Sequence, residues 1–163
     1  MKEAEAVSIR PARGLRDLAA TSQLFTAYAE FLGIDLSFQG FATEVKTLPG
    51  KYAPPTGEVL LACDSEDNAV GCVALRPLQS DGCCEMKRLY VTPTSRGLGL
   101  GRKLVGAILD VARCLGYLEM RLDTLSSMPK AMELYEKSGF TRVNAYYDTP
   151  LMDTVFYARS LRP

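Results

Sequence analysis

Residues 84–104 read CEMKRLYVTPTSRGLGLGRKL and contain, in order, a strand, a glycine-rich loop and the start of a helix. Leu89, Tyr90 and neighbouring β-formers favour the strand. The strand ends at Pro93, because proline cannot donate to a sheet ladder and biases the residue before it away from the helical conformation. From Leu104 onward, apolar residues recur at the spacing of one helix face. We expect the rest of the chain to assemble around this unit.

The loop of this unit places positive charge where a helix already has its positive pole. Arg96, Arg102 and Lys103 surround the predicted helix N-terminus, and a cation there costs up to about 1 kcal/mol unless an anion is bound. Alternating glycines let the backbone approach such an anion, and free N–H groups can bind its oxygens. The loop therefore predicts a phosphate or pyrophosphate site, and a glycine-rich turn with solvated basic side chains is the alternative. The glycines are Gly97, Gly99 and Gly101.

Two common phosphate motifs do not fit this loop. The dinucleotide pattern G-x-G-x-x-G puts Arg102 or Leu104 in place of its last glycine, and the loop has no Gly-Lys-Ser/Thr of a Walker motif. The pattern that fits is R-x-x-G-x-G, from Arg96 to Gly101, directly after a strand. It resembles the acyl-coenzyme A loop of the GNAT superfamily of N-acetyltransferases. A second segment, AMELYEKSGF at residues 131–140, is similar to the family pattern A-x-x-L-Y-E-x-x-G-F.

The composition is that of an ordinary globular domain. Of the 163 residues, 47% are hydrophobic and 23% charged, with 19 basic and 19 acidic side chains. No global positive field therefore favours nucleic acid or a membrane surface as a partner. No apolar run approaches the ~20 residues that span a bilayer, and the N-terminal residues lack the apolar core of a secretory signal. A cytoplasmic location is expected.

The chain contains no histidine and five cysteines. Without histidine, Ser-His-Asp and Cys-His catalytic groups and imidazole metal sites are excluded, so acid–base chemistry falls to Glu, Asp, Tyr, Lys or Cys. No metal is predicted. The odd number of cysteines is a poor disulfide framework, and most are expected to be small buried side chains. Cys84, beside an acidic residue, is the one considered as a reactive thiol.

Periodicity and turn signals predict one α/β (α+β) domain over residues 1–163, with about seven strands and about four helices. Two strands, at 83–91 and 117–124, are joined through a helix and should be parallel within a mostly antiparallel sheet. This is the element order of the GNAT fold, and the resemblance extends from Ile9 to Leu161. Strands are expected at 7–10, 58–63, 69–75, 83–91, 117–124, 140–147 and 155–161, and helices at 15–31, 41–48, from the glycine loop to 115, and from 129 to 138.

The resemblance implies that the chain binds acetyl-coenzyme A where the two parallel strands diverge. The backbone of Leu89, Tyr90 and Val91 would pair with the pantetheine arm. The N–H groups of the glycine loop and helix start would bind the pyrophosphate. Many family members have asparagine where this chain has Met128, so that polar contact to the pantetheine is absent here. The implied loop residues are Arg96, Gly97, Leu98, Gly99, Leu100, Gly101, Arg102 and Lys103.

Two residues match the catalytic positions of the family. Glu85 lies at the spacing before Arg96 where several members place a glutamate that acts as general base, directly or through water. Tyr135 matches the tyrosine that stands near the coenzyme sulfur as general acid, and it would also contact the cofactor. The alternatives are an ion pair of Glu85 with Lys87 or Arg88 on a solvated edge, and a packed aromatic ring at Tyr135.

The acceptor is expected to be a small-molecule amine or an amino acid, and the protein a monomer or homodimer. A mixed aromatic and charged lining suits such an acceptor better than a long peptide. An acyl-coenzyme A sensor or scaffold without turnover is the rival interpretation, although retention of both Glu85 and Tyr135 favours an enzyme. The candidate acceptor-binding residues are Tyr28, Asp35, Phe38, Gln39, Arg76 and Tyr147.

Overall fold

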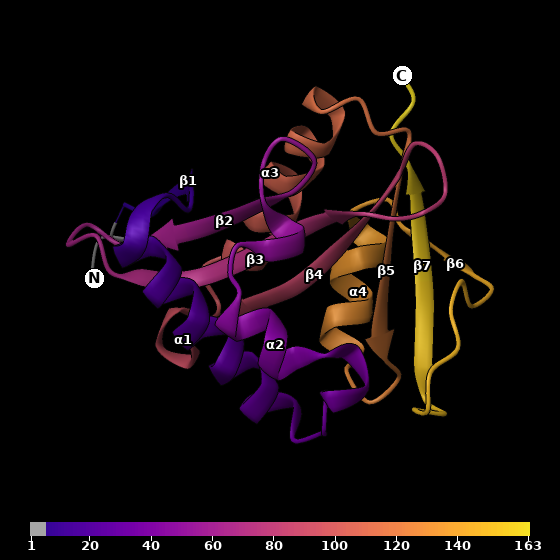
Figure 1. Ribbon diagram of the computed structural model, residues 1–163, viewed down its shortest axis with the longest axis horizontal. Helices are drawn as coiled ribbons and strands as arrows, with labels where there is room; N and C mark the ends of the chain where they lie inside the picture. The colour runs from indigo at the N-terminus through magenta and orange to yellow at the C-terminus, as the bar shows by residue number, and fades with distance from the viewer. Residues whose placement is uncertain (1–5) are drawn as a thin grey trace.

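The computed structural model describes residues 6–163, which form a mixed α+β fold with seven strands, four α-helices and three short 3₁₀ helices (Figure 1). The strands are β1 (Ser8–Pro11), β2 (Glu58–Cys63), β3 (Ala69–Pro77), β4 (Cys83–Val91), β5 (Glu119–Leu125), β6 (Thr141–Val143) and β7 (Thr154–Ser160). The α-helices are α1 (Gly14–Leu32), α2 (Phe41–Lys46), α3 (Leu100–Cys114) and α4 (Pro129–Lys137), and the 3₁₀ helices are η1 (Ser37–Gln39), η2 (Gly50–Tyr52) and η3 (Pro93–Ser95).

All seven strands belong to one sheet in the order β1-β2-β3-β4-β5-β7-β6. Every neighbouring pair is antiparallel except β4 and β5, which are parallel and are connected by α3. The predicted fold class and the parallel pair at the sheet centre are therefore confirmed. A crossover helix is what a parallel connection requires, because a tight turn cannot return the chain in the same direction.

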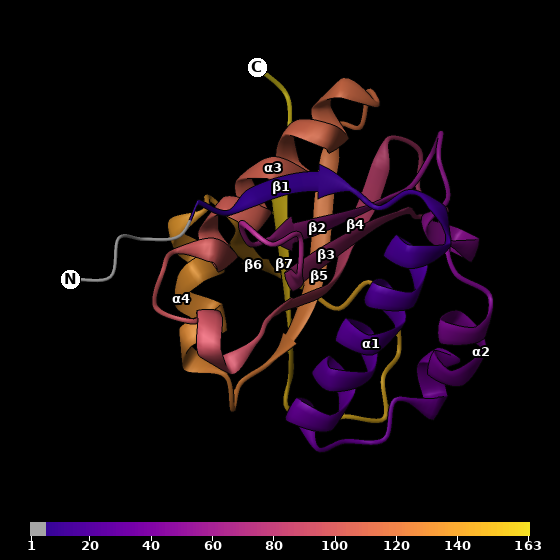
Figure 2. The same cartoon turned by 90° about the vertical axis from the view of Figure 1, so that its left-hand side faces the viewer.

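Helices cover both faces of the sheet (Figure 2). α1 and α2 lie on one face, and α3 and α4 on the other. Each layer has its own core: Phe25 and Tyr52 are fully buried under α1, whereas Leu104 and Ile108 anchor α3 against the opposite face. α1 ends at Gly33, whose φ of 65° lets its N–H reach two helix carbonyls, as the sequence predicted.

β4 and β5 pair over only three residues each before they diverge. Cys83–Glu85 face Glu119–Arg121, and beyond these residues no pairing joins the two strands. A bulge in β4 accompanies the divergence: two residues, Arg88 and Leu89, oppose the single Val73 of β3. Arg88 has a φ of 60°, a left-handed conformation that is uncommon outside glycine. The centre of the sheet therefore opens into a gap.

The bulge changes which face the β4 side chains address. Lys87 and Arg88 both point to the α1 and α2 side, because Lys87 hydrogen-bonds Gln39 and Arg88 pairs with Glu44 of α2. After the bulge, Leu89 returns to the α3 side, where it packs against that core. In a regular strand, Lys87 and Arg88 would point to opposite faces of the sheet.

The structure corrects three details of the predicted elements. The strand expected at 140–147 ends at Val143, because the next residues leave the sheet and fold over its gap. β3 continues through Arg76 and Pro77, which were expected to end it. α4 starts after Met128 without a side-chain cap, whereas Ser126 and Ser127 were expected to cap it.

All five cysteines are free thiols, and all but Cys114 are buried. Burial raises the pKa of Cys84 to about 12, which keeps this thiol protonated and argues against the reactive role considered for it. Within residues 6–163, no helix is both long and apolar enough to cross a bilayer.

Candidate active site

The gap between β4 and β5 opens into a polar cleft at the centre of the molecule. Lys87 and Leu89 line it from β4, Asp123 from β5, Tyr28 from α1 and Tyr135 from α4. The gap exists because parallel pairing stops at Glu85, so the backbone of β4 beyond that residue has no strand neighbour on the β5 side. Unpaired strand edges of this kind bind extended groups through their N–H and C=O groups.

A groove of ≈ 560 Å³ continues from the gap to the glycine loop. Most of the residues predicted to hold the coenzyme line it, whereas the exposed Leu98 and the basic Arg102 and Lys103 do not. Tyr135, also predicted to contact the cofactor, lines the gap cleft instead. The sequence did not identify Phe31, Ser95 and Lys130, which also line the groove. The predicted residues that line it are Leu89, Tyr90, Val91, Arg96, Gly97, Gly99, Leu100, Gly101 and Met128.

The N-terminus of α3 faces this groove with free backbone donors. No side chain caps the helix, and its first turn bonds only from Lys103 N–H to the Gly99 carbonyl at 3.2 Å. The N–H groups before Lys103 therefore have no helical acceptor. Gly97 and Gly99 have φ of 84° and 74°, so the loop needs glycine to present these donors. The geometry fits a phosphate or pyrophosphate group.

Arg96 is exposed, but its side chain lies over two aromatic rings. Its guanidinium carbon lies 4.6 Å from the ring centroid of Phe31 and 5.5 Å from that of Tyr90. Its Nε donates to the Val91 carbonyl at 3.0 Å. These contacts hold the start of the glycine loop against α1 and the end of β4. The side chain thus shapes the groove from a fixed position.

Tyr135 lines the gap cleft from α4. Its ring is buried between Phe140 and Tyr157, at centroid distances of 6.1 and 6.2 Å. Among residues 6–163, no hydrogen-bond partner of this hydroxyl is found, although the ring itself is firmly packed. Burial raises the pKa of Tyr135 above its ordinary value, so the phenol is protonated at neutral pH. The position predicted for a general acid therefore has a fixed ring and an available proton.

Glu85 lies at the last paired position of β4, and its side chain is only 1% exposed. Its Oε1 accepts from Arg76 Nε at 2.8 Å and its Oε2 accepts from the Tyr146 hydroxyl at 2.6 Å. Glu85 does not line the gap cleft, the groove that leads to the glycine loop, or the second cleft described below. The carboxylate predicted as a general base thus has both oxygens engaged inside the sheet.

Lys87 and Asp123 face each other across the gap at a distance longer than the hydrogen bonds of Glu85. Lys87 Nζ lies 3.8 Å from Asp123 Oδ1 and 3.9 Å from Glu85 Oε1, and it donates to Gln39 at 3.3 Å. Burial lowers the pKa of Lys87, while the two carboxylates oppose this effect. Asp123 also accepts a short hydrogen bond from the Tyr147 hydroxyl. Lys87 therefore has no carboxylate oxygen of residues 6–163 closer than 3.8 Å. The hydrogen bond that Asp123 accepts from Tyr147 comes from a neutral hydroxyl, which a charged donor can replace.

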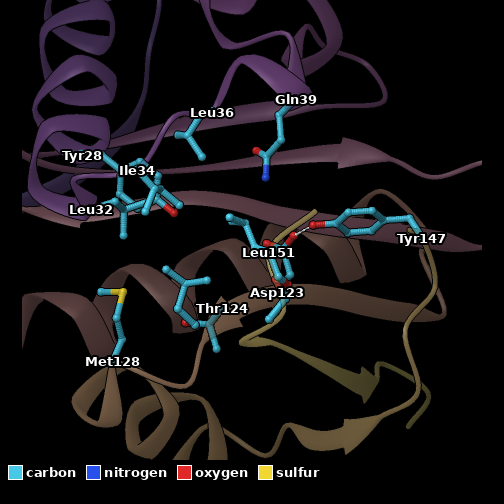
Figure 3. Close-up of a pocket in the computed structure, with 12 residues that line it drawn as sticks. Tyr28, Leu32, Ile34, Leu36, Gln39, Asp123, Thr124, Met128, Tyr147 and Leu151 are labelled. Carbon is cyan, nitrogen blue, oxygen red and sulfur yellow. Dashed lines mark hydrogen bonds between the residues drawn. The ribbon is translucent and has the colours of Figure 1, made fainter. Parts of the chain in front are cut away.

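A second cleft lies beside the gap, between the end of α1 and β5 (Figure 3). Its volume is ≈ 30 Å³. Tyr28 lines this cleft, the gap and the coenzyme groove, so the three adjoin one another. The lining residues are Tyr28, Leu32, Ile34, Leu36, Gln39, Asp123, Thr124, Leu125, Met128, Tyr147, Leu151 and Thr154.

Half of the predicted acceptor-binding residues line this cleft. Tyr28, Gln39 and Tyr147 do so. The other three lie elsewhere: Asp35 is exposed and accepts from the Ser37 N–H, Phe38 is exposed beside it, and Arg76 pairs with Glu85 inside the sheet.

Sequence reasoning missed the acid that does line the cleft. Asp123 follows Glu119 and Arg121 on the polar side of an alternating strand, which by itself indicates only a solvated face. The signal that could have found it is its position on the strand parallel to β4, on the same face as Glu85 and Lys87. Tyr146 was missed because the sequence predicted a strand there.

Comparisons with known proteins agree with this geometry. A family model described as the acetyltransferase (GNAT) family matches residues 23–140. An uncharacterized N-acetyltransferase of Schizosaccharomyces pombe is 42% identical over 150 residues, covering 92% of each chain. One of Dictyostelium discoideum is 28% identical and covers 83% of this chain and 90% of its own. The crystal structure of a GNAT-family acetyltransferase from Staphylococcus aureus superposes with a TM-score of 0.80 at 20% identity, covering 96% of this chain and 100% of that one.

Proposed function

This chain belongs to the acetyltransferase (GNAT) family, whose members generally take their acetyl group from acetyl-coenzyme A, and we propose that it transfers that group to a primary amine. The acceptor is a small molecule or an amino acid, and the amine attacks directly while both substrates are bound. The observation that carries this proposal is the gap between β4 and β5, which joins the glycine loop and the free N–H groups of α3 to a buried tyrosine.

The groove fits the coenzyme along its whole course. The N–H groups at the start of α3, with Gly97 and Gly99, suit the pyrophosphate. The unpaired β4 edge from Leu89 to Val91 suits the amides of the pantetheine arm. Lys130 at the groove wall adds a positive charge near the phosphates. Coenzyme bound in this way would bring its thioester to the gap cleft.

The reaction forms a C–N bond and breaks the C–S bond of the thioester. An alkylammonium has a pKa near ~10 and must lose a proton before it can attack. The departing thiolate, with an ordinary pKa of ~8.5, must gain one. Tyr135 can supply that proton, because it lines the gap cleft and burial keeps its hydroxyl protonated. The same burial disfavours a thiolate anion, which assists the transfer.

Proton removal from the amine involves the carboxylates of the gap. Glu85 was expected to act as the base, but its oxygens are held by Arg76 and Tyr146. It can receive a proton only through Tyr146 or an exchanged water. Asp123 is reached directly from the clefts.

A pair of substitutions at Gly99 tests the coenzyme site. Gly99 has a φ of 74°, a conformation that Asn and Asp both tolerate better than other residues. Gly99→Asp adds a negative charge near the pyrophosphate, whereas Gly99→Asn adds a side chain of the same size without charge. Two unit charges ~4 Å apart interact by about 4 kcal/mol at a surface-like dielectric, so acetyl-coenzyme A should bind the Asp variant about 10²-fold or more weakly than the Asn variant.

Isothermal titration of both variants with acetyl-coenzyme A measures this difference. Equal affinities would remove the phosphate assignment. A thiol-release assay over amines, amino acids, polyamines and aminoglycosides then tests catalysis. Tight coenzyme binding without release of thiol for any acceptor would instead indicate an acyl-coenzyme A sensor.

A further inference from the structure

We propose that Asp123 holds the ammonium group of the acceptor, and that the acceptor is a monoamine with an otherwise apolar body. This inference rests on the acetyl transfer proposed above and narrows its acceptor. In this arrangement the Asp123 carboxylate binds the amine. The Tyr147 hydroxyl competes for the same carboxylate and is displaced by the acceptor.

Asp123 is the acid placed between the acceptor cleft and the gap. It is the only carboxylate of residues 6–163 that lines either cleft or the coenzyme groove. Its side chain is 15% exposed, whereas that of Glu85 is 1% exposed. Tyr135 lines the gap on its other side. An amine bound to Asp123 would therefore stand next to the site where the thioester is expected.

The contacts of Asp123 leave room for an exchange of donors. Oδ2 accepts from the Tyr147 hydroxyl, and Oδ1 lies 3.8 Å from Lys87 Nζ. Tyr147 belongs to the segment between β6 and β7, and its ring enters the cleft beside Asp123 (Figure 3). An ammonium is a stronger donor to a carboxylate than a neutral phenol is. The incoming amine can therefore replace the tyrosine hydroxyl at the same oxygen.

The size of the cleft requires that replacement. With Tyr147 in place, the cleft has ≈ 30 Å³, which is room for a few water molecules but not for an amine with a large apolar body. Tyr147 and Leu151 both lie on the irregular segment 144–153, and neither is part of the sheet. Their movement would enlarge the cleft without breaking a strand pair.

The residues that line the cleft determine which group can be attached to the amine of the acceptor. No Lys or Arg among residues 6–163 lines it, so the carboxylate of an amino acid would have no cation to pair with. A second amine would likewise find no second acid. Lys87 lies in the gap, where it is already placed between two carboxylates. An alkyl or aryl body fits the apolar side chains that dominate the wall, which are Leu32, Ile34, Leu36, Leu125, Met128 and Leu151.

Three acceptors distinguish these alternatives with the full chain and acetyl-coenzyme A. They are 2-phenylethylamine, phenylalanine, which adds a carboxylate to it, and 1,4-diaminobutane, which carries a second amine. We expect kcat/KM, followed by thiol release, to be at least ~10-fold higher for 2-phenylethylamine than for the other two, as expected for an unpaired buried charge. A preference for phenylalanine or for the diamine would overturn the inference.

Two variants test the assigned contacts. Asp123→Asn should raise KM for 2-phenylethylamine by about 10- to 150-fold, the range for a lost charged hydrogen bond, and leave coenzyme affinity unchanged. The exposed Asp148→Asn, in the neighbouring segment, is the matched control and should leave KM unchanged. Tyr147→Phe should lower KM by about 2- to 10-fold, because the competing hydroxyl is gone. A structural or acceptor-binding role of Tyr147 would raise KM instead.

The outcomes separate this inference from the proposed function. If amines release thiol but Asp123→Asn leaves KM unaltered, or Tyr147→Phe raises it, the inference is overturned and acetyl transfer stands. If the chain binds no acetyl-coenzyme A or acetylates no amine, both are overturned. Should Asp123→Asn not fold, as judged by its thermal midpoint, the acceptor series and Tyr147→Phe decide the question, since neither alters Asp123.

Discussion

The ion pairs beneath α1 and α2 and the charged groups in the gap use the same kinds of residue, yet their charges meet at different distances. Arg10 binds Asp17 through two hydrogen bonds of 2.5 and 3.0 Å, and Arg88 binds Glu44 through two of 2.8 and 3.2 Å. In the gap, Lys87 Nζ comes no closer than 3.8 Å to a carboxylate oxygen.

The difference separates charges that hold the fold from charges that remain available to a substrate. A two-pronged guanidinium–carboxylate pair satisfies both partners and fixes their geometry. In the gap, Lys87 and Asp123 are shielded from water without being locked together. Glu85, the other carboxylate near Lys87, is held by Arg76 and Tyr146. We therefore expect substitutions in the first group to change stability, and substitutions in the gap to change activity.

The largest expected effect is on kcat and tests the role of Tyr135 in the gap. Tyr135→Phe should lower kcat by about 10²- to 10⁴-fold, the usual contribution of a general acid, because the proton for the departing thiolate is lost. Coenzyme affinity and thermal stability should stay close to those of the natural chain. Steady-state kinetics and isothermal titration measure both.

Tyr157→Phe is the matched control, since this ring packs on Tyr135, its hydroxyl donates to Glu136, and it does not line the gap cleft. It should leave kcat unchanged. An unaltered kcat in Tyr135→Phe would place Tyr135 among the packing residues.

The next effect tests the buried pair of α2 and β4. Glu44→Gln leaves the guanidinium of Arg88 buried, 1% exposed, with no counter-charge of its own, and should cost about 3–5 kcal/mol of unfolding free energy. Urea unfolding measures the loss. The double variant Glu44→Gln, Arg88→Met should be more stable than Glu44→Gln alone, because it removes the orphaned charge. A double variant at least as unstable as the single one would contradict the pairing.

Asp17 gives a smaller effect that depends on pH. It accepts from Arg10 and from the Arg13 N–H near the start of α1, so Asp17→Asn should cost about 1–3 kcal/mol. The Arg10 hydrogen bond lowers the pKa of Asp17 in the folded state. Its contribution is therefore complete above the unfolded pKa of ~3.9 and is lost as the pH falls below that value.

Urea unfolding of the natural chain and of Asp17→Asn, repeated from pH 7 downward, measures this dependence. The difference between them should be constant near neutral pH and should shrink in acid. A difference that grows as the pH falls would contradict the assignment.

The smallest effect belongs to the exposed pair on α4. Glu133 and Lys137 lie 2.7 Å apart, but both side chains are more than half exposed. Solvent screens such pairs almost completely. Glu133→Gln should therefore cause no measurable shift in the thermal midpoint. A clear loss of stability would mean that distance alone, and not burial, decides which ion pairs matter here.

Local signals explain why most of the fold was predictable from the sequence. Apolar spacing located α1 and α3, Gly33 marked the end of α1, and the glycine loop after β4 pointed to the groove that we propose for the coenzyme. Each of these depends on residues close together in the chain. The parallel pairing of β4 and β5 also followed, because the helix between them permits no other arrangement.

The chemistry of the gap was less predictable because it depends on distant contacts. Nothing in the sequence indicates that Arg88 adopts a left-handed conformation, since the bulge that contains it forms by pairing with the distant strand β3. The segment after β6 was predicted as strand because its tyrosines are β-formers. In the structure, the hydroxyls of Tyr146 and Tyr147 instead reach Glu85 and Asp123 across the gap.

The bulge at Arg88 affects how far β4 can run alongside β5. Without that residue, Val73 would face Leu89 directly, Cys72 would still face Tyr90, and Ala74 would still face Lys87. Every side chain of the two packed layers would keep its side of the sheet, while β4 would become straight enough to follow β5 further. A one-residue deletion here, made together with Glu44→Leu, should thus yield a folded protein that has lost the gap between β4 and β5 and, with it, thiol release from acetyl-coenzyme A. Folding and catalysis in this chain would then be separated by the residue that forms the bulge.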